Sequence, residues 1–205
     1  MYSNIEFSMH TVFAVVVLII QRYSFRIRRL LGRAISPPTY TEGVDLSGQI
    51  VVITGANAGI GRATATKLVS CGATVILGCR DIQKGIEAAQ QINADVRTLS
   101  DLKTPYATKG NASFMRLDLS DLNSVLEFSH RLKAEYPRVD ILVNNAGLNM
   151  QGMLSCGIEQ LFHVNYLGHY LLLRCLQKHL STKENGAPGA ARGVNLSSVM
   201  HHTGQ

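Results

Sequence analysis

A chain of 205 residues has room for one α/β domain with a sizeable core, but not for two ordinary domains and a linker. Its 46% hydrophobic and 17% charged residues exclude a disordered, collagen-like or disulfide-scaffold protein. Half of the net charge of +6 comes from residues 1–42, which contain five arginines and two glutamates. These arginines directly follow an apolar run, so the charge indicates membrane topology and argues against a nucleic-acid partner.

The first 42 residues predict a membrane anchor. The apolar stretch from Met9 to Ile20 is about a dozen residues long, shorter than the roughly 20 that cross a bilayer comfortably. The arginines behind it would hold the following chain in the cytosol, so we expect an anchor in the endoplasmic reticulum membrane with a cytosolic domain. A peptide that targets the protein to an organelle, or a plain hydrophobic tail, stays an alternative. Pro37 and Pro38 end this segment, which separates an N-terminal region of residues 1–42 from a predicted domain of residues 43–205.

From Gln49 onward, short β-branched runs alternate with longer helical patterns, which is typical of a parallel sheet with crossover helices. The predicted strands are 50–54, 74–77, 113–116, 141–143 and 193–196. The predicted helices are 59–71, 81–93, one capped by Ser120 that ends near Pro137, and a long one over 157–180; residues 94–112 are expected to form an irregular connection. The sequence thus predicts an α/β fold: a Rossmann-type doubly wound parallel sheet, incomplete with about five strands, preceded by an N-terminal hydrophobic helix. The expected strand order is 3-2-1-4-5, with the fifth strand as an exposed edge.

Helical spacing predicts which side chains face the core. The inward residues are Ile60, Thr64, Leu68 and Cys71 in the first helix, Leu122, Val125, Leu126 and Leu132 in the third, and Ile158, Leu161, Phe162 and Leu173 in the last. The four cysteines, Cys71, Cys79, Cys156 and Cys175, lack the spacing of a metal site. We expect reduced, buried thiols and no bound metal.

A glycine-rich turn follows the first strand and opens the first helix. It runs from Thr54 to Gly61, with Gly55, Asn57, Gly59 and Ile60 between them. Glycines let the backbone approach a pyrophosphate closely, and free amides at a helix N-terminus supply donors and partial positive charge. The spacing G-x-x-x-G-x-G differs from the general dinucleotide fingerprint, and a chance glycine turn is the alternative.

Arg80 at the end of the second strand bears on the choice of cofactor. A carboxylate near this position would bind the ribose 2′-hydroxyl of NAD, but the candidate position holds arginine. A guanidinium there favours the 2′-phosphate of NADP, although Asp81 lies beside it. A solvated arginine at a strand end is the alternative.

Four motifs in this order resemble the short-chain dehydrogenase/reductase family over about residues 45–205. They are Thr54-Gly-x-x-x-Gly-Ile-Gly61, Asp118-Leu119 after the third strand, Asn144-Asn145-Ala146-Gly147 after the fourth, and Asn165 in the last helix. Within the family, three further stretches resemble the retinol-dehydrogenase-like branch: Cys79-Arg80-Asp81, Val164-Asn165-Tyr-Leu-Gly-His169 and Val194-Asn-Leu-Ser-Ser198.

The resemblance implies roles for several of these residues. Asp118 would contact the adenine ring with help from the Leu119 amide, and Asn145, Ala146 and Gly147 would line the nicotinamide ribose. From the residues alone, Asp118 could equally cap a helix and the asparagines could be turn formers. The resemblance also places Asn165 in a water-linked proton relay, whereas its helical position allows a buried amide with a purely structural hydrogen bond. Ser198 would orient the substrate carbonyl.

In this family the acid/base is a tyrosine followed four residues later by a lysine, beyond the serine. The sequence ends at Gln205 without that pair, and Tyr170 with Arg174 is a poor substitute because arginine does not relay protons at neutral pH. We therefore expect an N-terminal portion of an NADP-dependent enzyme that interconverts an alcohol and a carbonyl on a lipophilic substrate such as a retinoid or steroid, without turnover by this chain alone. The alternative is an inactive dinucleotide-binding regulator, scaffold or shortened isoform.

Overall fold

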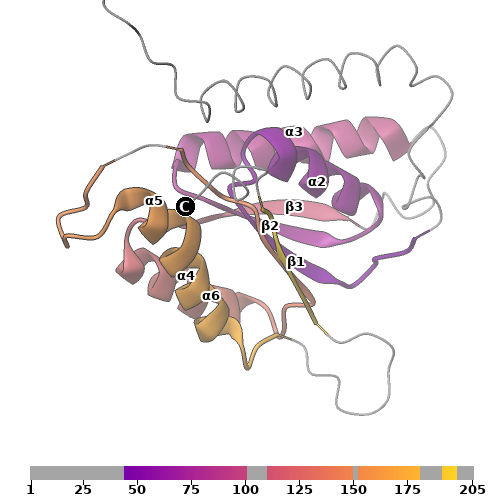
Figure 1. Ribbon diagram of the computed structural model, residues 1–205. Helices are drawn as coiled ribbons and strands as arrows, with labels where there is room; N and C mark the ends of the chain where they lie inside the picture. Colours follow the sequence, from indigo (N-terminus) through magenta and orange to yellow (C-terminus); the bar gives the residue numbers. More distant parts are fainter. Residues whose placement is uncertain (1–43, 101–109, 150–151, 181–190, 198–205) are drawn as a thin grey trace, which may run out of the picture. The chain divides into compact units, whose positions relative to one another are not determined.

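The computed structural model describes residues 44–100, 110–149, 152–180 and 191–197. Within them, a parallel sheet has the order β3-β2-β1-β4-β5 (Figure 1). The strands are β1 Ile50–Thr54, β2 Thr74–Cys79, β3 Asn111–Arg116, β4 Ile141–Asn144 and β5 Arg192–Asn195. The α/β class and the predicted strand order are confirmed. All four residues of β5 are exposed, as expected for an edge strand.

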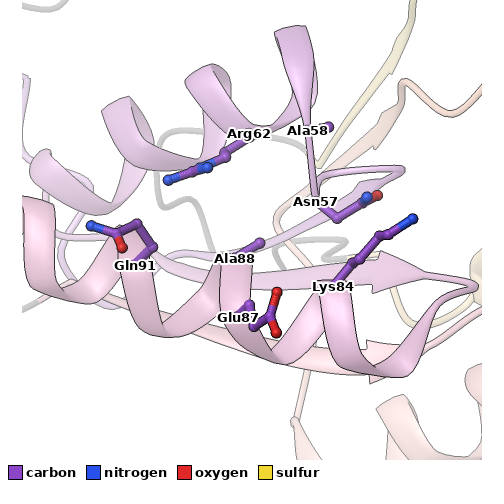
Figure 2. A pocket seen from close by; sticks show the side chains of 7 residues that line it. All are labelled: Asn57, Ala58, Arg62, Lys84, Glu87, Ala88 and Gln91. Carbon is purple, nitrogen blue, oxygen red and sulfur yellow. The ribbon is translucent and has the colours of Figure 1, made fainter.

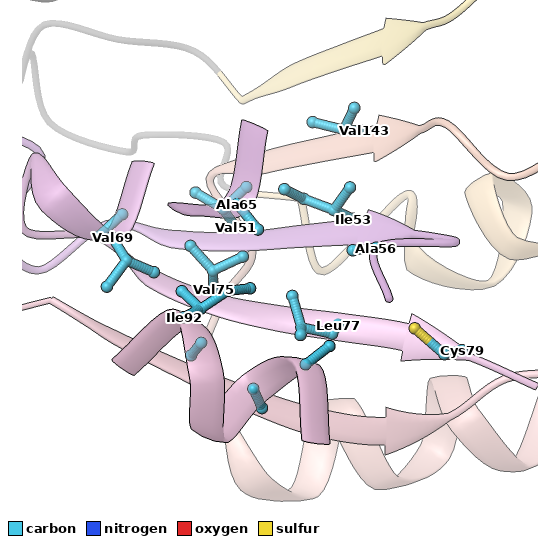
Figure 3. Packing of buried hydrophobic residues seen from close by; sticks show 14 of the residues in the cluster. Val51, Ile53, Ala56, Ala65, Val69, Val75, Leu77, Cys79, Ile92 and Val143 are labelled. Carbon is cyan, nitrogen blue, oxygen red and sulfur yellow. The ribbon is translucent and has the colours of Figure 1, made fainter. Parts of the chain in front are cut away.

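The helices are α2 Gly59–Ser70, α3 Ile82–Ser100, α4 Leu122–Glu135, α5 Gln160–Phe162, η1 His163–Leu167 and α6 Gly168–Leu176. α2 and α3 cover one face of the sheet, and α4 and α6 cover the other (Figure 1). Since successive side chains of a strand point to opposite faces, Val51 and Ile53 pack under α2 and α3, while Val52 packs toward α4 and α6. Figure 3 shows the first of these two cores, in which Val69 of α2 and Ile92 of α3 meet β1 and β2. β1 is therefore buried on both faces, which explains its uninterrupted apolar sequence.

The predicted N-terminal hydrophobic helix, with its apolar stretch Met9 to Ile20, lies outside the described residues. Among the residues that are described, none of the helices has the length and apolar character needed to cross a bilayer.

The predicted inward residues of α2 were right at its end and wrong at its start. Cys71 is buried and Leu68 is partly buried against the core, but Ile60 is 71% exposed, and the fully buried residues within the helix are Gly61, Ala65 and Val69. Small residues on this face let the helix approach the sheet closely, and their low hydrophobicity hid the face from the sequence pattern. α3 is also longer than predicted, because it continues through part of the expected connection to Ser100.

The N-cap of α4 lies one residue later than predicted. The side chain of Asp121 accepts a hydrogen bond from the Asn123 amide at 2.9 Å and so caps the helix in place of Ser120. The predicted inward residues Val125 and Leu132 are buried, but Leu122 and Leu126 are exposed and Phe128 takes the missed core position.

The long helix predicted for 157–180 is observed over residues 160–176; it is shorter at both ends than predicted, and a π-helical turn interrupts its α-helical hydrogen bonding. In η1 the amide of Gly168 bonds to the carbonyl of His163, five residues back. The wider turn shifts the buried face, since one extra residue is inserted into the helical spacing. Phe162 and Leu173, predicted to face inward, are exposed, and His163, Val164, Leu172 and Leu176 are buried.

The cysteines are free thiols, as predicted, but they are not all buried. Cys71 and Cys79 are buried and Cys175 is half-buried, whereas Cys156 is exposed in the loop before α5. The expectation of burial was therefore wrong for Cys156.

Two leucines on α4 offer a matched test of the core. Leu132→Ala should lower the free energy of unfolding of the 205-residue chain by about 2–5 kcal/mol, because Leu132 is fully buried and the cavity cannot collapse completely. Leu126→Ala, on the same helix but 39% exposed, should cost less than about 1 kcal/mol. Urea unfolding followed by circular dichroism measures both, and equal losses would contradict the described burial.

Candidate functional site

The carboxyl ends of β1 and β4 meet at the centre of the sheet. The chain runs from β1 out to β2 and β3 and then returns to β4 on the other side of β1. Such a reversal of winding leaves a crevice at the carboxyl ends of the two central strands, where α/β proteins bind ligands. The glycine turn follows β1 and the Asn144–Gly147 turn follows β4, so two of the predicted motifs lie side by side.

Two of the three loop glycines are required by close packing against the β4 turn. Gly55 has φ +66°, and a Cβ atom added to it would lie 2.8 Å from the Cα of Ala146. A Cβ on Gly61 would lie 2.9 Å from the carbonyl oxygen of Gly55 and would also collide with the Asn145 amide. Any side chain at either position would push the two turns apart.

Gly59 has a different role, because it faces open space at the start of α2. Its φ is +56°, and an added Cβ would meet nothing within 4 Å. No side chain caps the helix at Ala58, and the first turn of α2 holds no acidic residue. The first amides of an α-helix have no partner within it, so this end of α2 presents backbone donors and the positive end of the helix dipole. The arrangement fits an anionic group such as a pyrophosphate.

The hydroxyl of Thr54 joins the two turns. The buried Thr54 Oγ1 accepts hydrogen bonds from the amides of Asn145 at 3.0 Å and Ala146 at 2.9 Å. It also lies 2.9 Å from Nε2 of His169. Because the two amides occupy both lone pairs of the oxygen, we assign the hydroxyl proton to the bond with His169, whose Nε2 accepts it.

His169 is consequently neutral, with its proton on Nδ1. This nitrogen lies 3.2 Å from the backbone carbonyl of Asn165, which accepts its proton. Burial lowers the pKa of His169, and the hydrogen bond to Asn165 only partly opposes that effect. The imidazole therefore connects β1 to η1 as a fixed, uncharged link.

Asn145 fastens the glycine turn with its side chain. Its Nδ2 donates to the carbonyls of Thr54 at 2.8 Å and Gly55 at 3.2 Å. Below the same turn lies Cys79, whose thiol receives hydrogen bonds from the amides of Ala56 and Asn57 while burial raises its pKa. The loop that the sequence predicts as a phosphate cradle is thus held from both sides by β4 and β2.

Asn165 has the partners that its amide needs, but it is exposed on η1 and not buried as its predicted face required. Its Oδ1 accepts from the amide of Leu148 and its Nδ2 donates to the carbonyl of Leu148, both at 2.9 Å. The side chain ties η1 to the segment after Gly147, while its backbone carbonyl receives the proton of His169.

Asp118 and Leu119 follow β3 at the carboxyl edge of the sheet. Asp118 Oδ1 accepts from the amide of Ser120 at 2.9 Å and from its hydroxyl at 2.6 Å, so Asp118 shapes the turn before α4 and does not cap the helix. Leu119 is buried, and its carbonyl lies 3.2 Å from Nδ1 of His163 in η1. β3 is thereby linked to the same helix as the β4 turn.

Arg80 makes none of the contacts described above and is exposed just after β2, and Ser198 lies outside the described residues. Tyr170, which the sequence analysis rejected as an acid/base, is 53% exposed and stacks on Tyr166, with ring centroids 6.3 Å apart. Sequence reasoning quoted His169 only as part of a motif and assigned it no role.

A pocket of about 380 Å³ adjoins the glycine turn between α2 and α3 (Figure 2). Asn57 and Ala58 of the turn line one end of it, and Arg62 and Lys84 contribute the basic side chains. Neither basic residue was singled out from the sequence. The sequence offered only one signal for them: Arg62 comes three residues after Gly59 and Lys84 four residues after Arg80, both of which are predicted site residues.

Removal of the Thr54 hydroxyl should destabilise the domain. Thr54→Val leaves two half-buried amides and the buried His169 imidazole without their partner, so we expect the free energy of unfolding to fall by about 1–3 kcal/mol. Thr54→Ser keeps the hydroxyl and should recover most of that loss. Thr66→Val is the control, because the Thr66 hydroxyl donates only to the carbonyl of Arg62 one turn earlier. Urea unfolding measures all three variants. If Thr54→Val lowers the free energy of unfolding no more than Thr66→Val does, the Thr54 hydroxyl does not hold the two turns together.

The neutral His169 predicts an acid-sensitive fold. Because its pKa is lowered in the folded state, the unfolded chain binds more protons once the pH falls below the ordinary histidine value of about 6.5. The stabilisation is therefore complete above that pH and is lost as the pH falls from about 6.5 through the lower pKa of the folded state. The difference in unfolding free energy between wild type and His169→Gln, measured from pH 8 to pH 5, should shrink on acidification. A constant difference would show that His169 does not titrate in this window.

Comparison with known proteins agrees with the resemblance of the motifs. A family model described as short chain dehydrogenase matches residues 49–204. Retinol dehydrogenase 12 of Mus musculus is 43% identical over 168 residues, which cover 80% of this chain and 48% of that protein. Retinol dehydrogenase 11 of Homo sapiens is 38% identical over 184 residues, which cover 88% of this chain and 51% of that protein. The chain thus spans about half the length of these relatives.

Solved structures share the fold. RhlG of Pseudomonas aeruginosa, in a complex with NADP, matches with a TM-score of 0.62 and 28% identity over 76% of this chain and 56% of that one. A chain from Escherichia coli CFT073 complexed with NADPH matches with a TM-score of 0.59 and 26% identity over 78% of this chain and 62% of that one. The predicted resemblance to the retinol-dehydrogenase-like branch is confirmed by the identities above. Since the family model spans most of the chain, and the strand order and paired turns are in place, this protein belongs to the short-chain dehydrogenase family.

Proposed function

We propose that the whole protein interconverts an alcohol and a carbonyl with NADP, and that the dinucleotide pyrophosphate binds at the start of α2. One observation carries the proposal: the first turn of α2 is uncapped, beside a glycine with φ +56° that faces open space, at the point where the sheet reverses its winding. The dinucleotide supplies the hydride acceptor or donor, and the protein supplies binding and orientation.

Different residues would hold different parts of the dinucleotide. The amides of Gly59 and Ile60 would meet the pyrophosphate, and Asp118 would lie beside the adenine. Asn145, Ala146 and Gly147 would line the nicotinamide ribose, with the positions of the first two fixed by the Thr54 hydroxyl. Asn165 acts as a positioning residue, because both ends of its side-chain amide are held by Leu148. Ser198 would orient the substrate carbonyl.

The charged side chains near the end of β2 favour NADP over NAD. Arg80 is exposed there, whereas the carboxylate of Asp81 accepts the amide of Lys84 at 3.0 Å and starts α3. That hydrogen bond and the neighbouring Lys84 ammonium lower the pKa of Asp81, which stays ionised. Two structural neighbours carry NADP or NADPH, which supports the same choice.

The substrate is a small lipophilic alcohol or carbonyl, such as a retinoid or steroid. The relatives named retinol dehydrogenase support this class. The apolar stretch Met9 to Ile20 and the arginines behind it support an anchor in the endoplasmic reticulum membrane, with the domain in the cytosol. Such a placement would bring a lipophilic substrate to the site from the bilayer.

This chain by itself should bind the dinucleotide without turnover. None of its tyrosines is followed four positions later by a lysine, the pair that the family uses to exchange a proton with the carbonyl oxygen. An inactive binder with a regulatory role is the second candidate, and the same observation supports it. Calorimetry with NADPH, followed by assays with a panel of aldehydes and ketones, tests both candidates. Reproducible turnover by residues 1–205 would contradict the need for the pair.

Substitutions at two glycines distinguish a loss of cofactor affinity from the effect of backbone strain. Gly59→Ala should weaken NADPH binding by about tenfold or more, because the new methyl group occupies the space proposed for the pyrophosphate. Gly48→Ala is the matched control: Gly48 also has positive φ, +77°, and open space around its Cβ position, but it lies before β1. Both substitutions should destabilise the fold similarly, as residues with side chains are strained at positive φ. Equal NADPH affinities of the two variants, measured by calorimetry, would rule out the proposed pyrophosphate position.

A further inference from the structure

The outer edge of β3 is closed at one residue by a side chain from α3. Asn93 Oδ1 accepts a hydrogen bond from the Ala112 amide at 2.8 Å, and Asn93 Nδ2 donates to the Ala112 carbonyl at 2.9 Å. These are the two bonds that a neighbouring strand would make with Ala112, since a side-chain amide carries the same kinds of donor and acceptor as a peptide group. Asn93 therefore takes the place of a strand at this position.

Ala112 is one of three β3 residues whose backbone faces away from the sheet. The amides of Asn111 and Leu117, at the two ends of β3, donate to carbonyls on the β2 side at 3.1 and 3.0 Å. The backbone groups of successive residues point to opposite sides of a strand, so those of Ala112, Phe114 and Arg116 point away from β2. β3 is the outermost strand of the sheet on this side, so these groups lie along its edge.

The packing of α3 brings Asn93 to this edge. Ala89 and Ile92 of α3 are buried in the core that lies over β1 and β2. Near the start of the helix, Gly85 lets the ring of Phe114 lie directly against the helix backbone, because a Cβ atom there would overlap the ring. Asn93 follows Ile92 and is half-buried, so its amide leaves the helix beside the buried stripe and reaches β3.

A second copy of the chain is the strand that this edge would fit. If two β3 strands ran antiparallel with Phe114 opposite its counterpart, Ala112 of each strand would lie opposite Arg116 of the other. All the outward residues would then form facing pairs, and each such pair exchanges two hydrogen bonds. Like charges would not face each other, because Arg116 meets Ala112. With Asn93 in place, both outer pairs are lost and only the central pair is left.

We propose that Asn93 keeps two copies of this chain from joining their sheets through β3. An unprotected strand edge is a template for another strand, and proteins close such edges with charges, bulges or covering segments. Here one side-chain amide closes the edge, and the exposed Arg116 places a charge at the other end of the strand. The proposal does not depend on the dinucleotide site, so either can fail without the other.

The first test compares the oligomeric states of variants of the 205-residue chain. Asn93→Ala should self-associate about tenfold or more tightly than wild type, because it frees both Ala112 groups for pairing. Gln91→Ala is the matched control, since the Gln91 amide bonds to Asp95 on the same helix, at 2.7 Å, and its loss should leave self-association unchanged. Sedimentation velocity over an about tenfold range of protein concentration measures each variant.

Hydrogen exchange followed residue by residue by NMR shows which surface associates. In wild type the Phe114 amide should exchange faster than the Ala112 amide, which Asn93 holds. As Asn93→Ala associates, the Phe114 amide should become protected by about tenfold or more, because it lies at the centre of the proposed pairing. A purely structural role of Asn93 would lower the stability of the chain without protecting Phe114.

Three results would overturn the proposal. Asn93→Ala could associate no more than Gln91→Ala, it could associate without protecting the Phe114 amide, or that amide could already be as protected as that of Ala112 in wild type. If circular dichroism shows that Asn93→Ala does not fold, Asn93→Asp decides by the same criteria. Its carboxylate still accepts the Ala112 amide but repels the Ala112 carbonyl, so it should also associate.

Discussion

The hydroxyl of Thr54 is the contact on which the site depends. One oxygen, fully buried at the end of β1, accepts two amides of the β4 turn and donates to His169 in α6. Three segments that are remote in sequence therefore meet at a single atom. Because such a buried oxygen has no water to replace a lost partner, the β1 and β4 turns keep one relative position. The two turns are therefore held together by the protein itself, independently of any ligand.

That rigidity explains the different roles of the glycines. Gly55 and Gly61 lie where the two turns touch, and side chains there would separate them. Gly59 lies on the outer side of the same loop, where nothing within the described domain approaches it. The loop thus packs inward on one side and leaves backbone amides open on the other. A rigid frame with unpaired donors is the preorganisation that anion binding requires, since little ordering remains to be done on binding.

The π-helical turn connects the turn after β3 to the hydrogen bonds that hold the β1 and β4 turns together. By bonding Gly168 to His163, η1 turns His163 and His169 inward, where they reach the carbonyl of Leu119 and the hydroxyl of Thr54. The turns after β1, β3 and β4 are thereby connected through one helix. The pocket beside α3 lies on the opposite face of the sheet from η1 and α6.

The sequence by itself determined the strands, their order and the place of the glycine turn, because buried parallel strands and glycine spacing are local patterns. The family motifs also singled out Asn145 and Asn165. Only the tertiary structure decided which groups their side chains bond to, since hydrogen bonds between residues far apart in the chain leave no periodic signal. It also corrected the burial of α2 and of the segment after β4: a face of Gly61, Ala65 and Val69 is too weakly hydrophobic to be detected, and one extra residue in η1 shifts the helical spacing. Arg62 and Lys84 lacked a signal of their own, because only the folded chain shows which surface side chains line the pocket between α2 and α3.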